Sequence, residues 1–246
     1  MSRFDAFAYY TDTEVSHRTA TRARLVQSMQ RYDTSAIALV SGVAADCDFV
    51  AGNQSLREIT SSSDGIFGLV TLNLAYPEES LEQQRLHLMR REFLASVLIG
   101  RVGCPVTLSD ASELVNAQRR YAKPIAIYTP DAEAVHEAAK IAAEFTGIKF
   151  IFLNMGGDNW HLAVTAAKRQ LNIYLELSGS LDTDKVAHAS TVVTARKLLY
   201  GSNLPYSDPE LVAGMIDDAV TLTASDRNRI YYQNAAALFS VQTDAD

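Results

Sequence analysis

The chain of 246 residues has little cysteine, no excess of positive charge and no long apolar run. Its two cysteines, Cys47 and Cys104, are too few for a disulfide framework and are typical of a reducing compartment. The 22 lysines and arginines are outnumbered by 29 aspartates and glutamates, and a net charge of −7 argues against nucleic-acid or anionic-lipid partners. No stretch approaches the roughly 20 apolar residues of a membrane-spanning helix. Asp5, Asp12 and Glu14 interrupt any secretion signal, so we expect a cytoplasmic protein.

The chain has an even composition, with 48% hydrophobic and 21% charged residues, as globular proteins do. No linker divides it, so we predict one domain over residues 1–246. Short apolar runs alternate with segments of helical periodicity. The predicted strands are Phe4–Tyr10, Ser35–Gly42, Ile66–Asn73, Ala95–Val102, Pro124–Thr129, Lys149–Asn154, Asn172–Ser178 and Lys197–Ser202. The predicted helices are about Arg18–Arg31, Ser55–Ser62, Ser80–Phe93, Ser109–Tyr121, Asp131–Phe145, Asn159–Gln170, Asp182–Ala195, Pro209–Ala219 and Ala224–Phe239.

The order of these elements predicts the fold class. Eight strands that alternate with helices form a parallel sheet of βα units. Eight such units in about 250 residues indicate a (β/α)₈ TIM barrel, in the α/β class. A doubly wound open sheet is the alternative, but no G-x-G-x-x-G turn follows the first predicted strand.

In such a barrel, chemistry is located where the strands end, at the mouth. The polar residues that fall there, and that we single out as site candidates, are Tyr9, Arg101, Tyr128, Asn154, Glu176, Ser178, Asn203 and Tyr206. The period of two places Asp5, Phe7 and Tyr9 on one face of the first strand, with Asp5 nearer the barrel floor. All five histidines fall on predicted helices or their starts. The strand ends therefore offer only Asp5 and Glu176 as metal ligands, and we predict no bound metal and no cofactor.

Each candidate has a structural alternative. Glu176 is either half of an ion pair with Arg101 across the barrel or an acid or base with a pKa raised by burial. Arg101 either binds a carboxylate or phosphate of a ligand or pairs with a loop acid. Asn154 and Asn203 are turn residues or ligand contacts, and the tyrosines are packing residues or hydrogen-bond donors.

Several motifs resemble one family. These are KFIFLNMGG at 149–157, NIYLELSG at 172–179, KLLYGSNLPYSDPEL at 197–211 and YYQNAAALF at 231–239. They resemble the amidohydrolase-2 family, the metal-dependent TIM-barrel hydrolases and decarboxylases related to aminocarboxymuconate semialdehyde decarboxylase. The first half fits more loosely, and FDAFAY at 4–9 stands where the family has Ile-Asp-x-His-x-His. The resemblance implies an amidohydrolase-like barrel.

The resemblance also implies that the metal ligands are replaced. The two histidines of the first strand fall on Phe7 and Tyr9, and those of the fifth and sixth strands fall on Tyr128 and Asn154. The aspartate of the last strand, which is both ligand and general base in the family, falls on Asn203. Whether such a chain is an enzyme stays open at this point.

Three hypotheses follow. The chain is a non-catalytic or small-ligand-binding relative, with Asn203 among the contacts. Alternatively, it is a metal-independent hydrolase or lyase for a small carboxylated substrate that uses Glu176, Arg101 and the tyrosines. The catalytic candidates are then Glu176 and Asn203, and Glu176 should face an open pocket. The third hypothesis is a true metal-dependent hydrolase with other ligands. A homo-oligomer would suit a barrel, but the sequence does not decide it.

Overall fold

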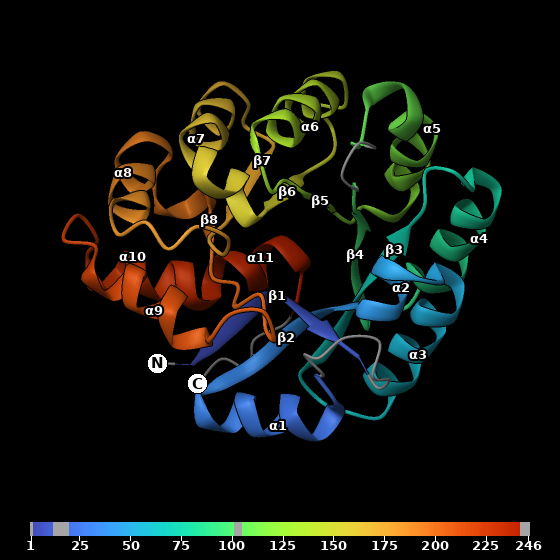
Figure 1. The fold of residues 1–246 in the computed structure, drawn as a ribbon, viewed down its shortest axis with the longest axis horizontal. Coiled ribbons are helices and arrows are strands. Elements are labelled where there is room, and N and C mark those ends of the chain that lie inside the picture. The colour runs from blue at the N-terminus through green and yellow to red at the C-terminus, as the bar shows by residue number, and fades with distance from the viewer. Residues whose placement is uncertain (1, 12–19, 101–104, 242–246) are drawn as a thin grey trace.

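A computed structural model of the chain describes residues 2–11, 20–100 and 105–241. Its centre is one eight-stranded sheet in the order β1 to β8, in which each strand pairs in parallel with the next (Figure 1). The strands are β1 (Arg3–Tyr10), β2 (Thr34–Ser41), β3 (Ile66–Leu72), β4 (Phe93–Leu98), β5 (Ile125–Tyr128), β6 (Phe150–Leu153), β7 (Ile173–Glu176) and β8 (Leu198–Leu199). The predicted (β/α)₈ barrel is confirmed.

Backbone hydrogen bonds between β1 and the segment around the end of β8 close the ring. The amide of Ala6 donates to the carbonyl of Tyr200 at 2.9 Å, and the amide of Asn203 donates to the carbonyl of Phe7 at 2.9 Å. The amide of Tyr9 donates to the carbonyl of Leu204 at 2.7 Å. The segment that carries Asn203 is therefore fixed directly against β1.

Helices surround the barrel (Figure 1). They are α1 (Arg22–Arg31), α2 (Gly42–Asp46), α3 (Phe49–Ser61), α4 (Pro77–His87), α5 (Leu108–Gln118), η1 (Arg119–Tyr121), α6 (Ala132–Glu144), η2 (Asn154–Asn159), α7 (Trp160–Arg169), α8 (Asp184–Val193), η3 (Ala195–Lys197), α9 (Pro209–Asp218), α10 (Ala224–Asn228), η4 (Arg229–Gln233) and α11 (Asn234–Phe239). None of the helices described is long and apolar enough to cross a membrane.

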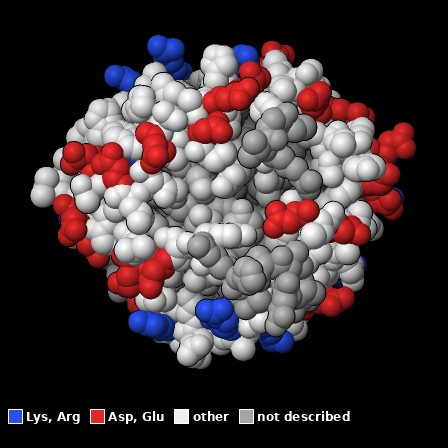
Figure 2. Space-filling model, viewed as in Figure 1, with Lys and Arg blue, Asp and Glu red and all other residues white. Residues whose placement is uncertain are grey.

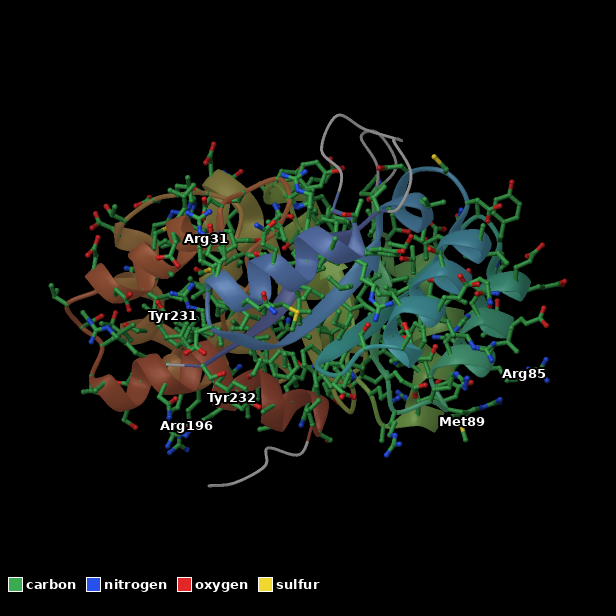
Figure 3. The ribbon with its side chains drawn as sticks, turned by 90° about the horizontal axis from the view of Figure 1, so that it is seen from below. Arg31, Arg85, Met89, Arg196, Tyr231 and Tyr232 are labelled. Carbon is green, nitrogen blue, oxygen red and sulfur yellow. The ribbon has the colours of Figure 1, made fainter. Side chains whose placement is uncertain are left out.

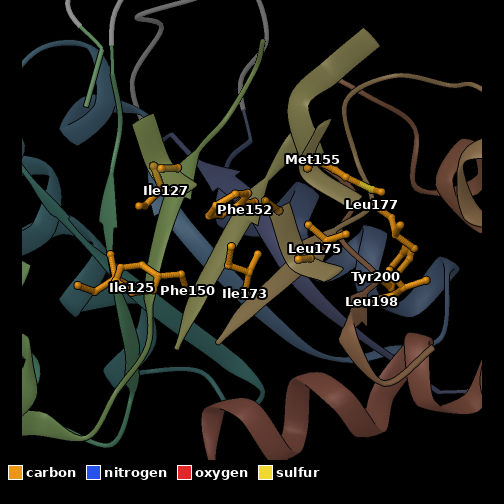
Figure 4. Close-up of a cluster of buried hydrophobic side chains, with 14 of the residues drawn as sticks. Ile125, Ile127, Phe150, Phe152, Met155, Ile173, Leu175, Leu177, Leu198 and Tyr200 are labelled. Carbon is orange, nitrogen blue, oxygen red and sulfur yellow. The ribbon is translucent and has the colours of Figure 1, made fainter. Parts of the chain in front are cut away.

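The barrel buries two apolar layers. The outer face of the strands packs under the helices with residues such as Ile127, Phe152 and Leu175 (Figure 4). The inner layer includes Ala126, Ile151 and Leu199, and α11 adds side chains to this layer. The lower part of the barrel is thus a solid apolar core, which leaves polar chemistry to the strand ends.

Among the differences from the sequence prediction, two have a clear local cause. A shift of register lies between Asp5 and Ala8 of β1, so the adjacent Ala6 and Phe7 both enter the inner layer. Simple alternation therefore does not hold along β1, although Phe7 and Tyr9 do lie together in the inner layer as predicted, with 5.1 Å between their ring centroids. The helix expected to start at Ser55 begins at Phe49, because the side chain of Asp48 caps it through two backbone amides.

Candidate functional site

The ends of the strands surround a hollow in the centre of one face (Figure 2). Of the eight predicted site residues, seven lie in the described part of the chain. They form two sets: hydrogen bonds join Tyr128, Asn154, Glu176 and Ser178, while Tyr206 packs against Tyr9 and donates its amide to the carbonyl of Asn203 at 2.9 Å. Arg101 lies outside the described residues, so neither its predicted ion pair with Glu176 nor its contact with an anionic ligand can be placed.

Glu176 ends β7 and is completely buried. One carboxylate oxygen, Oε1, accepts the amide of Ser178 at 2.7 Å. The other, Oε2, accepts the amide of Asn154 at 2.9 Å and the hydroxyl of Ser178 at 2.7 Å. Burial raises the pKa of Glu176, and these donors and the charge of Lys185 oppose that rise. The carboxylate thus ties the ends of β6 and β7 together, and it does not face an open pocket as the catalytic hypothesis expects.

Two residues that the sequence analysis missed hold Glu176 in place. A Cβ at Gly201 would lie 2.3 Å from Oε1 of Glu176, so only glycine fits there. The ammonium of Lys185 is buried and donates to the carbonyls of Leu177 at 2.7 Å and Ser180 at 2.5 Å. Burial lowers the pKa of Lys185 to about 8. A lysine on the first turn of a helix, just after a strand end, was the signal available in the sequence.

Both asparagines of the mouth have left-handed backbones, with φ of 62° at Asn154 and 55° at Asn203. The side chain of Asn154 accepts the hydroxyl of Ser178 at 3.1 Å and donates to the hydroxyl of Tyr128 at 3.4 Å. The Oδ1 atom of Asn203 is buried and has no hydrogen-bond partner among the described residues. Left-handed non-glycine residues are uncommon and gather at functional sites.

Three tyrosines line the same region. The ring of Tyr9 makes edge contacts with Phe7 at 5.1 Å and with Tyr206 at 5.2 Å between ring centroids. Burial raises the pKa of Tyr9 and of Tyr128, and the electrostatic effect of the nearby Tyr206 raises both pKa values further. The phenols of Tyr9 and Tyr128 are therefore neutral near pH ~7, since an unperturbed tyrosine titrates at about 10. They can donate and accept hydrogen bonds but do not act as phenolates.

The side chain of Asp5, on β1, contacts the segment that follows β8. Its carboxylate accepts the amide of Ser202 at 2.9 Å, the hydroxyl of Ser202 at 2.5 Å and the amide of Phe7 at 3.2 Å. Burial raises its pKa to about 7, against the pull of these donors. The hydrogen bonds of Asp5 therefore connect the first strand to the segment that follows the last strand.

The donor atoms of the mouth are unlike a divalent-metal site. Phe7 has no donor, and Tyr9, Tyr128, Asn154 and Asn203 are all uncharged there. Divalent transition metals take imidazole, thiolate or carboxylate ligands. In the portion of the chain that the structure describes, no three histidine, cysteine, aspartate or glutamate side chains form a group that could hold a metal ion.

Known proteins resemble the chain over almost its whole length. A family model described as Amidohydrolase matches residues 2–241. No curated protein matches the sequence. A 2,6-dihydroxybenzoate decarboxylase from Rhizobium superposes with a TM-score of 0.77 at 13% sequence identity, over 98% of this chain and 99% of that chain.

Two further solved structures are similar. A dihydroxybenzoic acid decarboxylase from Polaromonas sp. JS666, with bound manganese and the inhibitor 2-nitroresorcinol, has a TM-score of 0.76 at 14% identity over 98% of this chain and 97% of that one. A 5-carboxyvanillate decarboxylase from Novosphingobium aromaticivorans, complexed with manganese, has a TM-score of 0.73 at 12% identity over 97% and 96%. At such identities the likeness shows the fold alone.

Proposed function

Because the chain belongs to the amidohydrolase family, we propose that it is a divergent member that binds a small molecule at the barrel mouth without a divalent metal ion. The observation that carries this proposal is Asn203, a half-buried residue on a left-handed backbone whose Oδ1 has no hydrogen-bond partner among the described residues. A buried acceptor without a partner costs about 1–3 kcal/mol. An O–H or N–H group of a ligand would recover that cost.

The chemistry around Asn203 indicates the ligand. The amide of Tyr206 donates to the carbonyl of Asn203 at 2.9 Å, and the ring of Tyr206 packs against the ring of Tyr9 with 5.2 Å between centroids. Tyrosines present a flat apolar face and one polar atom. A small aromatic compound with hydroxyl groups fits such a set. The structural relatives act on, or hold, dihydroxybenzoates and 2-nitroresorcinol, and this compound class is a reasonable first probe.

The donor set supports binding without a metal. The five positions at which the family resemblance expects ligands carry one phenylalanine, two tyrosines and two asparagines. None of them is charged. The two buried carboxylates beside them already accept hydrogen bonds: Glu176 accepts three from Asn154 and Ser178, and Asp5 accepts three from Ser202 and Phe7. A metal ion here would have to displace those donors.

A second candidate is a metal-independent hydrolase or lyase for a small carboxylated substrate. The raised pKa of Glu176 favours it, because general acids need such a shift. Full burial of Glu176 opposes it. The inference that the substrate carries a carboxylate came from Arg101, which lies outside the described residues, so the carboxylated substrate stays a prediction.

Two measurements test the proposal. Elemental mass spectrometry of the purified protein, before and after a soak in zinc and manganese, should find no stoichiometric metal. About one equivalent of either metal would overturn the metal-free site and favour the third hypothesis, a metal-dependent hydrolase.

The second measurement is calorimetric titration with 2,6-dihydroxybenzoate. The variant Asn203→Gly keeps the left-handed backbone and removes the side-chain acceptor. We expect it to bind about 5- to 10-fold more weakly, the loss of one buried hydrogen bond. Asn116→Ala, on the exposed side of α5, is the matched control and should bind like the wild type. Equal affinity for the Asn203 variant and the wild type would contradict the proposal.

A further inference from the structure

A groove of about 660 Å³ lies on the outside of the barrel between α4 and α5, which are at the right of Figure 1. One wall is α4. The other wall is α5 together with η1, which continues α5 directly. Arg85, which lines the groove from α4, lies at the outer edge of the molecule (Figure 3). The groove therefore belongs to the outer surface of the helix ring and not to the barrel mouth.

The groove is lined by a hydrogen-bond acceptor that lacks a partner. Gln84 is completely buried, and its Nε2 donates to the carbonyl of Leu114 at 3.1 Å and to Oε1 of Gln118 at 2.9 Å. Both of these atoms can only accept, because Nε2 of Gln118 itself donates to the carbonyls of Lys123 and Pro124. The amide of Gln84 therefore cannot be turned over, and its Oε1 has no partner in the part of the chain that the structure describes. Such an acceptor favours an occupant that brings N–H donors.

The charges that line the groove cancel. Glu82 and Arg85 of α4 pair with each other at 3.6 Å. Glu113 of α5 and Arg120 of η1 are both exposed, and neither side chain has a hydrogen-bond or ion-pair partner among the described residues. The whole chain has a net charge of −7, so two copies repel each other over most of their surfaces. A neutral face with two unengaged charges of opposite sign is a place where two copies can approach.

The residues of the α5 wall are arranged symmetrically. They are spaced at i, i+3, i+4 and i+7 and therefore lie on one face of the helix: Glu113, Asn116, Ala117 and Arg120. If two such faces pack antiparallel about a two-fold axis between Asn116 and Ala117, Glu113 of one copy faces the partner's Arg120. The same pair repeats on the other side of the axis. Each acid then meets a base, and the small side chain of Ala117 leaves room for the helices to approach.

The composition around the groove is also typical of an interface. Leu86 of α4 is 46% exposed, and Met89, two residues beyond the end of α4, is 76% exposed. Tyr121 and two arginines line the groove itself. Tyrosine, methionine and arginine are enriched in protein–protein interfaces, which as a whole are no more apolar than the rest of a protein surface.

We propose that the α4–α5 groove is the interface of a symmetric homodimer, in which α5 of a second copy lies antiparallel to α5 of the first. Glu113 and the partner's Arg120 form an ion pair on each side of the two-fold axis. The partner's Asn116 brings an N–H donor to the groove, where Oε1 of Gln84 lacks one. Exposed ion pairs contribute little each, so we expect a weak dimer, with a dissociation constant on the order of 100 μM, that separates at micromolar concentration. The interface does not depend on the function proposed for the mouth.

Sedimentation equilibrium of the full chain, up to about 1 mM, tests the interface. The wild type should show a monomer–dimer equilibrium that weakens as the salt concentration rises. Arg120→Glu should raise the dissociation constant about ten-fold or more, because both symmetry-related pairs become contacts between like charges. Glu113→Arg should do the same, although it makes the chain less negative. The two changes together exchange the charges and should restore the wild-type dissociation constant.

Arg196→Glu is the matched control, because it makes the same change of charge at an exposed arginine on the opposite side of the molecule from Arg85 (Figure 3). It should leave the dissociation constant close to that of the wild type.

Several results would overturn the interface. A wild type that stays monomeric at about 1 mM would show that the copies do not associate. A dimer that neither Arg120→Glu nor Glu113→Arg weakens would show that the copies meet elsewhere. Equal weakening by Arg196→Glu and Arg120→Glu, or tighter association of Glu113→Arg, would show that net charge alone governs the association. A double variant that keeps its circular dichroism spectrum but does not regain affinity would contradict the antiparallel pairing.

Discussion

Replacing Glu176 by glutamine should destabilise the protein by about 2 kcal/mol near neutral pH. Glutamine keeps the shape of the side chain but offers one acceptor oxygen where glutamate has two. In the structure each oxygen accepts a backbone amide, that of Ser178 on Oε1 and that of Asn154 on Oε2. Whichever way the new amide turns, its NH₂ group faces one of these N–H donors.

The magnitude follows from burial. Glu176 has no exposed surface, so the donor that loses its acceptor cannot turn to water, and such a loss costs about 1–3 kcal/mol. The hydroxyl of Ser178 can rotate to accept from the new amide. The best orientation therefore sacrifices one backbone bond and the attraction of Lys185, which gives the value of about 2 kcal/mol.

Equilibrium urea unfolding, followed by the fluorescence of the single tryptophan, Trp160, measures the difference. Glu113→Gln, at an exposed position on α5, is the control and should stay within about 0.5 kcal/mol of the wild type. A loss for Glu176→Gln no larger than that of the control would refute the reasoning. Unchanged stability with a lost activity would instead identify Glu176 as a catalytic acid or base.

Three further predictions concern the same strand ends. Burial raises the pKa of Asp5 to about 7, above its ordinary value of 3.8, so the folded state holds this proton more firmly than the unfolded chain. Its contribution to stability is therefore full below about pH 4 and is lost as the pH rises through about 7. The pH dependence of the urea unfolding midpoint across this range should be weaker in Asp5→Asn than in the wild type. An identical pH profile in the variant would contradict the assignment. Gly201→Ala should lower the free energy of unfolding in urea by about 1–3 kcal/mol, because the new Cβ would clash with Glu176. Gly214→Ala, in open space on α9, is the control and should be neutral or stabilising. Similar free energies of unfolding for the two variants would contradict the prediction. Lys185→Met should lower the thermal midpoint by several degrees, since buried carbonyls lose their donor, and an unchanged midpoint would rule out that structural role.

The sequence predicted the barrel because its signal is repeated eight times. Each βα unit pairs an apolar strand with an amphipathic helix, so an error at one boundary leaves the architecture unchanged. The strand ends were less accurate. The sixth and eighth strands were expected to reach Asn154 and Ser202, but they end at Leu153 and Leu199. Asn154 and Asn203 adopt left-handed backbones after them, a state that asparagine tolerates but does not require.

By itself, the sequence determined the fold, the family and which residue types stand at the ends of the strands. These follow from local periodicity and from motifs, which need no knowledge of contacts. Tertiary structure alone decided what those residues do. Only the approach of β6 to β7 and β8 surrounds Glu176 with donors and Gly201, and only the closure of β1 onto the last strand buries Asp5. Burial and partners set the pKa and the role of a carboxylate, and both arise between segments that are distant in the chain.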